Sequence, residues 1–179
     1  MLKDIKERFL TKEALEKLIQ DAENGDPAAQ LELGIQYLEG IYSDEDFLLE
    51  KDKEKAFSWV LKSAENGNAI AQNRIGTWYS HGIGCEKDYY NAAYWLEESA
   101  KNGNDQAQFT IGTYYLHGRG VAKNINTAID WFHRSANQGN IAAKQQLQSL
   151  GVRGYESYDI DDDVDFNNQA RFEFSHVKK

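Results

Sequence analysis

Apolar positions recur along the chain with a helical spacing. Alanine, then leucine or isoleucine, then tyrosine stand four residues apart in three places: Ala29, Leu33, Tyr37; Ala71, Ile75, Tyr79; and Ala107, Ile111, Tyr115. Side chains four residues apart lie on one face of a helix, so this pattern predicts helices over about 27–39, 69–81 and 105–117. A second helix is predicted after each of these, through an Ala-x-x-Trp pattern that begins at Ala56, Ala92 and Ala128.

The two helical patterns alternate within a repeated unit. Six positions recur 36 residues later, with Gly67, Gly76, Gly82, Gly84, Ala92 and Trp95 returning as Gly103, Gly112, Gly118, Gly120, Ala128 and Trp131. Three earlier glycines (Gly25, Gly34, Gly40) precede their counterparts by 42 residues. The first unit therefore carries six extra residues, between Ile41 and Asp52. A period of this length is typical of stacked helix-pair repeats.

Short polar residues and glycines mark where the predicted helices begin and end. Cap-type residues precede the helices at Asp26, Asp52, Asn68, Asp88, Asn104, Asn124 and Asn140. Gly40, Gly82 and Gly118 fit the left-handed position that ends a helix. A glycine inside a helix costs about 1 kcal/mol relative to alanine. The recurrence of Gly34, Gly76 and Gly112 therefore predicts a neighbouring helix too close to admit a Cβ atom.

The repeats divide the chain into a solenoid and a tail. We expect a half-unit at 11–25, units at 26–67, 68–103 and 104–139, a terminal helix at 140–151, and an acidic, aromatic tail at 152–179. At the two ends, polar Lys17 and Gln148 replace the repeat's Trp and mid-helix Gly, as suits units that no further repeat covers.

These residues resemble the Sel-one-like repeat (SLR) family, a relative of the tetratricopeptide repeat. The third unit matches its pattern most fully, at Ala100, Gly103, Ala107, Gly112, Tyr115, Gly118, Gly120, Val121, Ala128 and Trp131. The departures are the six-residue insertion, Tyr42 at a loop glycine position and Cys85 at a loop valine position. The resemblance implies an all-α fold, a right-handed α-solenoid of antiparallel helix pairs whose concave groove binds other proteins. It implies no catalytic chemistry and names no partner.

Composition narrows the classes of partner and compartment. The net charge of −9 argues against nucleic acid, which needs a basic surface, and suits a basic protein partner. One cysteine excludes an internal disulfide and suits a reducing compartment. No window approaches the ~18 apolar residues of a membrane span, and the first ten residues lack the apolar core of a signal peptide. We therefore expect a cytoplasmic protein with no membrane contact.

The residues that invite a chemical reading fit structural roles better. Gly82-x-Gly84 follows no strand and recurs with the repeat, so it predicts a turn between helices and not a dinucleotide loop. Cys85 is expected to be an inert packing residue. His81 and His117, one repeat apart, are expected to make surface hydrogen bonds, with ligand contact as the alternative. Asp159–Asp165 begins like a calcium loop but lacks its glycine and its closing glutamate. We expect no metal, no cofactor and no enzyme activity.

The partner is expected to bind along the edge of the first helices that faces the groove. A helical wheel places nine residues there: Glu32, Gln36, Glu39, Arg74, Trp78, His81, Thr110, Tyr114 and His117. Trp78 and Tyr114 are the predicted anchors, because aromatic side chains dominate binding energy in protein grooves. The alternative is that these two rings only pack between repeats.

Two segments outside the repeat pattern offer secondary contacts. The acidic insertion surrounds Phe47 and Leu48, which either tuck onto the first unit or form a specificity loop. In the tail, Asp161 and Asp163 lie between aromatic residues, so the tail either docks on the solenoid or joins a partner interface.

Three functions are open for such a binder, the first two of them implied by the family resemblance, with the acidic charge favouring the first. The first is an immunity or antitoxin protein that neutralises a basic toxin domain. The second is an adaptor in signalling or cell-envelope complexes. The third, carried by the His81/His117 edge, is a peptide- or metabolite-responsive regulator.

Overall fold

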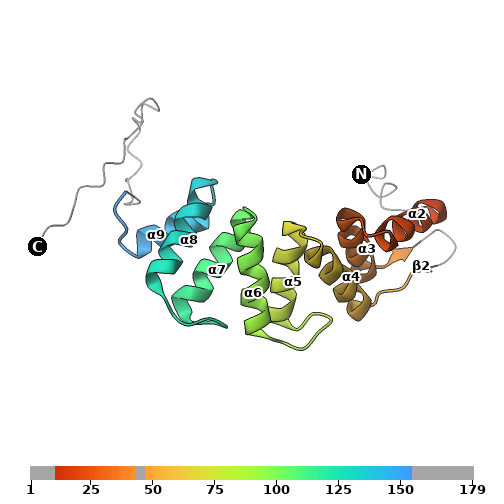
Figure 1. The fold of residues 1–179 in the computed structure, drawn as a ribbon, viewed down its shortest axis with the longest axis horizontal. Helices are drawn as coiled ribbons and strands as arrows, with labels where there is room; N and C mark the ends of the chain where they lie inside the picture. Colours follow the sequence, from red (N-terminus) through yellow and green to blue (C-terminus); the bar gives the residue numbers. More distant parts are fainter. Residues whose placement is uncertain (1–10, 43–46, 155–179) are drawn as a thin grey trace, which may run out of the picture.

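The chain forms an elongated stack of helices. The computed structural model describes residues 11–42 and 47–154. The described helices follow one another along the long axis, from α2 at one end to α9 at the other (Figure 1). Their bounds are α2 (Lys12–Glu23), α3 (Pro27–Glu39), α4 (Lys53–Glu65), α5 (Ala69–His81), α6 (Tyr89–Lys101), α7 (Asp105–His117), α8 (Ile125–Asn137) and α9 (Ile141–Ser149).

Each repeat is a pair of packed helices, and each pair contacts the next. The pairs are α3 with α4, α5 with α6, and α7 with α8, while α2, α4, α6 and α8 each also contact the helix that follows. The predicted first helices at 27–39, 69–81 and 105–117 are confirmed to the residue. The expected all-α solenoid is confirmed, with one addition, a two-stranded ribbon in the insertion.

Side-chain caps explain why the helices begin where they do. Every described helix is preceded by a residue whose side-chain oxygen accepts a hydrogen bond from a backbone N–H two or three residues later. The caps are Thr11, Asp26, Asp52, Asn68, Asp88, Asn104, Asn124 and Asn140. This satisfies N–H groups that a helix cannot pair internally.

The mid-helix glycines are the points where paired helices approach most closely. A Cβ atom on Gly34 would lie 2.6 Å from Val60 Cγ2. On Gly76 it would lie 2.8 Å from Leu96 Cγ, and on Gly112 the nearest atoms belong to the Phe132 ring. Contacts under 3.0 Å are essentially never seen for real Cβ atoms. The prediction that these positions exclude a side chain is therefore confirmed.

Gly40 departs from the other helix-ending glycines. Gly82 and Gly118 adopt the left-handed conformation that was predicted. Gly40 also has a positive φ of 77°, but its ψ of 151° lies outside the left-handed region. The cause is the insertion, because the chain leaves Gly40 directly into strand β1 (Ile41–Tyr42) instead of a second turn.

The insertion packs part of its apolar content onto the first unit. Strand β1 pairs antiparallel with β2 (Phe47–Leu49), with Ile41 opposite Leu49. Ile41 is buried and Leu49 packs against the cluster that Ile41 forms with α2 and α3. The Phe47 and Leu48 side chains, residues 43–46 and the tail with Asp161 and Asp163 lie outside the described part, so their expected contacts stay predictions.

A polar ladder joins successive repeats, and the periodicity of apolar residues does not reveal it. The Nε2 groups of Gln30, Gln72 and Gln108 each donate to a carbonyl of the preceding helix, at 3.1 Å. Their Oε1 atoms accept from the amides of Asn66, Asn102 and Gln138. The three glutamines are 4–5% exposed. Since buried amides are costly when unpaired, the ladder fixes how one unit sits on the next.

Candidate protein-binding surface

The two predicted anchors lie in the core. Trp78 is 3% exposed and packs in a cluster built by α3, α4 and α5. Tyr114 is 5% exposed and packs in the next cluster, with α6 and Trp131. The physical reason is their helical position, three residues after Ile75 and Ile111 and so beside the apolar face. The burial corrects the expectation that these rings are open to a partner and supports the packing alternative.

The other seven predicted groove residues lie outside the core. Glu32, Glu39, His81 and His117 are exposed, and Gln36, Arg74 and Thr110 are partly exposed. Thr77 and Thr113 complete the row, since they lie three residues after Arg74 and Thr110 and are also partly exposed. We define the first-helix face as these nine residues: Glu32, Gln36, Glu39, Arg74, Thr77, His81, Thr110, Thr113 and His117. These two threonines were not among the residues predicted from the sequence, and the equivalent position in α3 is Ile35, which packs against the core.

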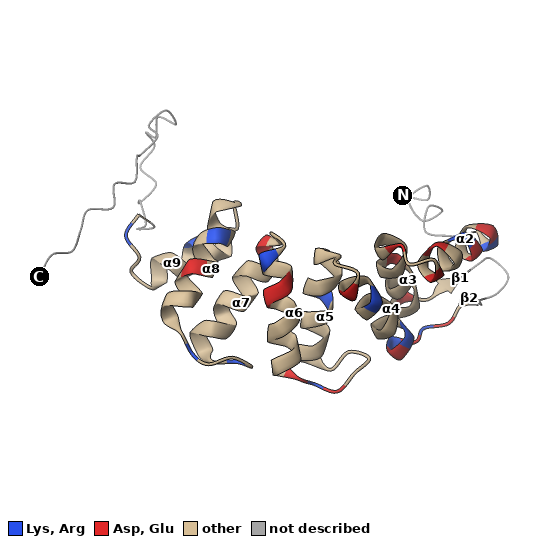
Figure 2. Cartoon of the chain, viewed as in Figure 1, with Lys and Arg blue, Asp and Glu red and all other residues tan. Residues whose placement is uncertain are grey.

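Charge changes along this face from one repeat to the next. Helix α3 contains two acidic residues, Glu32 and Glu39, and no lysine or arginine. In α5 the charged residue is Arg74, which forms no ion pair with a described residue. Figure 2 shows the acidic residues in red and the basic residues in blue along these helices. The face therefore presents an acidic section on α3 and a basic one on α5.

Local hydrogen bonds hold the polar side chains of the face. Gln36 Nε2 donates to Glu32 Oε1 at 2.5 Å, which keeps the two side chains together one turn apart. His81 Nδ1 lies 2.8 Å from the carbonyl oxygen of Thr77 and 2.8 Å from Ser80 Oγ. The expectation that His81 makes a surface hydrogen bond is confirmed, and one of its ring nitrogens is thereby engaged within its own helix.

One residue of α5 is polar where the equivalent helices are apolar. Asn73 occupies the position of Leu31 in α3 and of Phe109 in α7, both of which pack in core clusters. Its Oδ1 atom is buried and has no hydrogen-bond partner in the described structure. A buried unpaired acceptor destabilises a fold by about 1–3 kcal/mol. No sequence signal other than the comparison of the three units would have found it.

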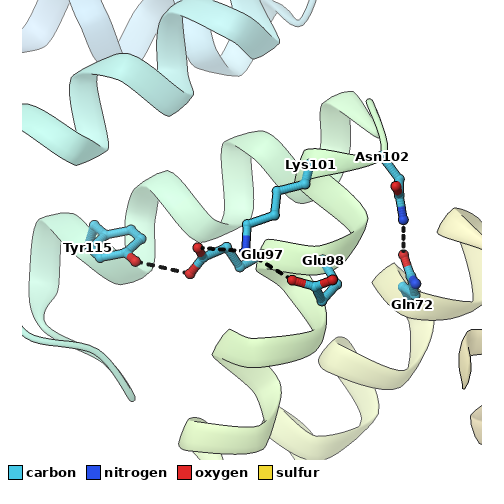
Figure 3. Close-up of polar contacts among 6 residues, drawn as sticks. All are labelled: Gln72, Glu97, Glu98, Lys101, Asn102 and Tyr115. Atoms are coloured by element: carbon cyan, nitrogen blue, oxygen red, sulfur yellow. Dashed lines mark hydrogen bonds and ion pairs between the residues drawn. The ribbon is translucent and has the colours of Figure 1, made fainter. Parts of the chain in front are cut away.

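The second helices carry a separate network of charges. Lys101 Nζ lies 3.2 Å from Glu97 Oε1 and 2.9 Å from Glu98 Oε1, and Tyr115 of α7 donates to Glu97 Oε2 at 3.0 Å (Figure 3). The hydrogen bonds to Glu98 and Glu97 raise the pKa of Lys101. Burial and the Glu97 carboxylate raise the pKa of Tyr115. These contacts tie α6 to α7 and leave Lys101 committed within its own repeat.

The lone thiol has the environment of a packing residue. Cys85 is partly buried and its Sγ lies 3.8 Å from the carbonyl oxygen of Trp78. Burial and the nearby Asp88 carboxylate raise the pKa of the Cys85 thiol. Reactive cysteines need the opposite shift, because the thiolate is the nucleophile.

The described part of the chain has neither a cluster of metal-binding side chains nor a helix that could span a membrane. Over residues 11–42 and 47–154, no group of three or more His, Cys, Asp or Glu residues is placed to hold a metal ion. Within the same part of the chain, no helix has the length and apolar character to cross a bilayer.

Comparison with known proteins places the repeat in a family. A family model for the Sel1 repeat matches residues 27–68, 69–104 and 105–140. The search of curated proteins found no match.

Among solved structures, a Sel1 repeat protein from Oxalobacter formigenes is 38% identical, with a TM-score of 0.68 over 75% of this chain and 97% of that one. The protective antigen c5321 of uropathogenic Escherichia coli, which displays an SLR fold, is 29% identical with a TM-score of 0.57. That match covers 78% of this chain but 36% of c5321.

Helicobacter pylori cysteine rich protein B is 21% identical with a TM-score of 0.56, over 76% of this chain and 93% of that one, and shows the fold alone. Sel1 repeat proteins are protein-interaction modules built on a non-catalytic scaffold. With three matched repeats and these structural neighbours, the chain belongs to the Sel1 repeat family.

Proposed function

We propose that this protein binds a protein partner through the first-helix face, and that a basic segment of the partner lies against α3. The observation that carries the proposal is the variation of this face. The apolar positions of Ala29, Leu33 and Tyr37 recur in every unit, whereas one position of the face changes from Glu32 to Arg74 to Thr110. Packing therefore does not set the side chain at this position, which leaves it available for contacts with a partner.

The two charged sections of the face suit a partner that carries both signs. The carboxylates of Glu32 and Glu39 attract lysine or arginine side chains. Arg74 attracts a carboxylate, which its planar guanidinium can hold with two hydrogen bonds.

The net charge of −9 favours a partner that is basic overall. Among the roles open to such a binder, we favour the stoichiometric neutralisation of a basic toxin domain, as an immunity or antitoxin protein would perform it. The single free cysteine suits the cytosol as the compartment. An adaptor would instead hold several partners weakly.

Affinity capture from the native host tests the proposal. The wild type is compared with E32K/E39K, and with the control E65K/D130K, which changes the net charge equally at exposed positions of the second helices. We expect one tightly bound basic protein, at equal stoichiometry, whose affinity falls about tenfold or more in E32K/E39K. The control should bind within about twofold of wild type.

Equal loss in both variants would mean that only overall charge matters, and the first-helix face would lose its support. Several weak partners would favour the adaptor role over neutralisation.

A further inference from the structure

A second cluster of charge lies along the edge where the first helices end. The loop between α5 and α6 and the loop between α7 and α8 both run along this edge, at the bottom of Figure 1. Each loop carries lysine or arginine (Figure 2). Lys87 lies in the first loop, Arg119 lies in the second, and Tyr89 is the first residue of α6 between them.

The two cations share one aromatic ring. Lys87 Nζ lies 4.8 Å and Arg119 Cζ lies 5.3 Å from the centroid of the Tyr89 ring. Arg119 also lies 5.7 Å from the ring of Tyr114, which meets Tyr89 edge to face at 6.3 Å. Cations are attracted to aromatic rings at such distances, so both side chains are held at the Tyr89 ring.

The backbone of the second loop fixes the position of Arg119. Gly118 and Gly120 flank it, both with positive φ, of 70° and 68°. Gly120 packs so closely on the start of α6 that a Cβ atom there would lie 1.9 Å from the carbonyl oxygen of Tyr89. The loop is therefore seated on α6, which fixes the backbone from which the Arg119 side chain reaches the Tyr89 ring.

The repeat does not require this cluster. One unit earlier, the positions of Tyr89 and Arg119 are held by Lys53 and Ile83, although the glycine contact itself is kept. One unit later, the position of Tyr89 is held by Ile125. The combination of two cations and a tyrosine occurs at one junction of the described solenoid, which indicates a local role.

In the described structure neither carboxylate beside Lys87 in sequence, Glu86 or Asp88, forms an ion pair with it. Asp88 is committed to capping α6, where it accepts hydrogen bonds from the backbone N–H groups of Tyr90 and Asn91 and from the Asn91 amide. Within the described ranges, neither Lys87 nor Arg119 forms an ion pair. Two like charges at one ring repel each other, and an incoming anion relieves that repulsion.

The Tyr89 hydroxyl experiences the same positive field. Its interaction with Lys87, together with the charges of Lys87 and Arg119, lowers the pKa of Tyr89. The hydroxyl is thus a polarised hydrogen-bond donor beside two cations.

We propose that Lys87, Arg119 and Tyr89 form a second binding site, for side-chain carboxylates on an acidic segment of a protein partner. The guanidinium and the ammonium pair with the carboxylates, and the Tyr89 ring supplies contact area. A nucleic acid fits less well, because the protein's net charge of −9 repels a long polyanion while a few carboxylates meet only the local field. This site uses none of the residues assigned to the first-helix face.

The full chain is titrated, at about 20 mM salt, into a fluorescein-labelled oligoglutamate peptide, and binding is followed by fluorescence anisotropy. The test variant is K87Q/R119Q. The matched control is K62Q/R134Q, which removes two other cations stacked on aromatic rings, 4.0 Å from Trp59 and 4.6 Å from Trp131. We expect K87Q/R119Q to weaken binding about tenfold and the control to change it less than about twofold. The charge-conserving variant K87R/R119K should keep most of the affinity.

Three results would overturn the proposal. The first is that the wild type does not bind the oligoglutamate peptide, and the second is that K87Q/R119Q and the control weaken binding equally. The third is that a labelled oligothymidylate binds the wild type more tightly than the peptide does, and that this binding is lost in K87Q/R119Q. The last would assign the site to a nucleic acid. Circular dichroism of each variant shows that the comparison is between folded proteins. Because E32K/E39K leaves this cluster intact, failure here is distinguishable from failure of the proposed function.

Discussion

Replacement of Gly76 by alanine measures how tightly paired helices are packed. A Cβ atom at this position would lie 2.8 Å from Leu96 Cγ, 3.0 Å from the carbonyl oxygen of Ala92 and 3.1 Å from the backbone nitrogen of Leu96. Leu96 is fully buried and two of the three atoms are backbone, so the α6 backbone must move away by a few tenths of an ångström. Overpacking of this kind costs about 1–3 kcal/mol, and we take about 3 kcal/mol because the backbone atoms cannot rotate away.

Alanine also gains helix propensity at that position. A glycine inside a helix is about 1 kcal/mol less favourable than alanine. The expected net loss of unfolding free energy for Gly76→Ala is therefore about 2 kcal/mol, or a fall in Tm of roughly 6 °C for a domain of this size. Thermal and urea unfolding followed by far-UV circular dichroism measure both quantities. Ser58→Ala, at an exposed position of α4, is the control and should be neutral or slightly stabilising.

At Gly112, an added methyl group would meet a side chain and not the backbone, so a second substitution can relieve the clash. There the three nearest atoms all belong to the Phe132 side chain, at 2.6, 2.8 and 3.2 Å. Gly112→Ala should therefore be partly rescued by Phe132→Leu, whereas no single side-chain change should rescue Gly76→Ala. If Gly76→Ala is as stable as the wild type, the close approach of α5 and α6 is not what retains the glycine.

Other substitutions test separate parts of the structure. Asn73→Leu should stabilise the protein by about 1 kcal/mol in urea unfolding, because it removes a buried unpaired oxygen; a loss of stability would mean that Asn73 has a partner. Asn102→Ala should destabilise it by about 1–3 kcal/mol, because it leaves the buried Gln72 Oε1 without its donor, while the exposed control Asn137→Ala should not. The backbone hydrogen bond from Asn91 lowers the pKa of Asp88 in the folded state, so its contribution to stability is present above about pH 4 and is lost as the pH falls through the folded pKa. Asp88→Asn should therefore lose less Tm than the wild type between about pH 5 and pH 2, and an identical loss would contradict this assignment.

The sequence predicts the helices well because their ends are encoded locally. A capping residue such as Asn68 fixes the first turn of its helix, and a glycine such as Gly82 ends the helix by adopting the left-handed conformation. The same signals recur in each unit, so each helix is predicted several times over. Gly40 is the exception, because its conformation depends on the ribbon that follows it and not on the residue itself.

The binding surface is harder to predict because neighbouring helices decide which side chains they cover. Trp78 lies at the border of the apolar face of α5, and the packing of α3 and α4 against that border decides that it is buried. The site formed by Lys87, Tyr89 and Arg119 is even harder to predict from the sequence. It joins residues from two loops and a helix start, 32 positions apart from Lys87 to Arg119, and no local pattern brings them together.

Site-specific photo-crosslinking in the native host tests most directly that a protein partner lies on the first-helix face. Benzoylphenylalanine is placed at His81, on that face, or at Tyr94, an exposed aromatic position on α6 that is 54% accessible. Both changes replace one exposed ring by another. The account predicts a single crosslinked protein from the His81 position and little or none from the Tyr94 position. Crosslinking from Tyr94 alone would contradict it and move the interface to the second helices.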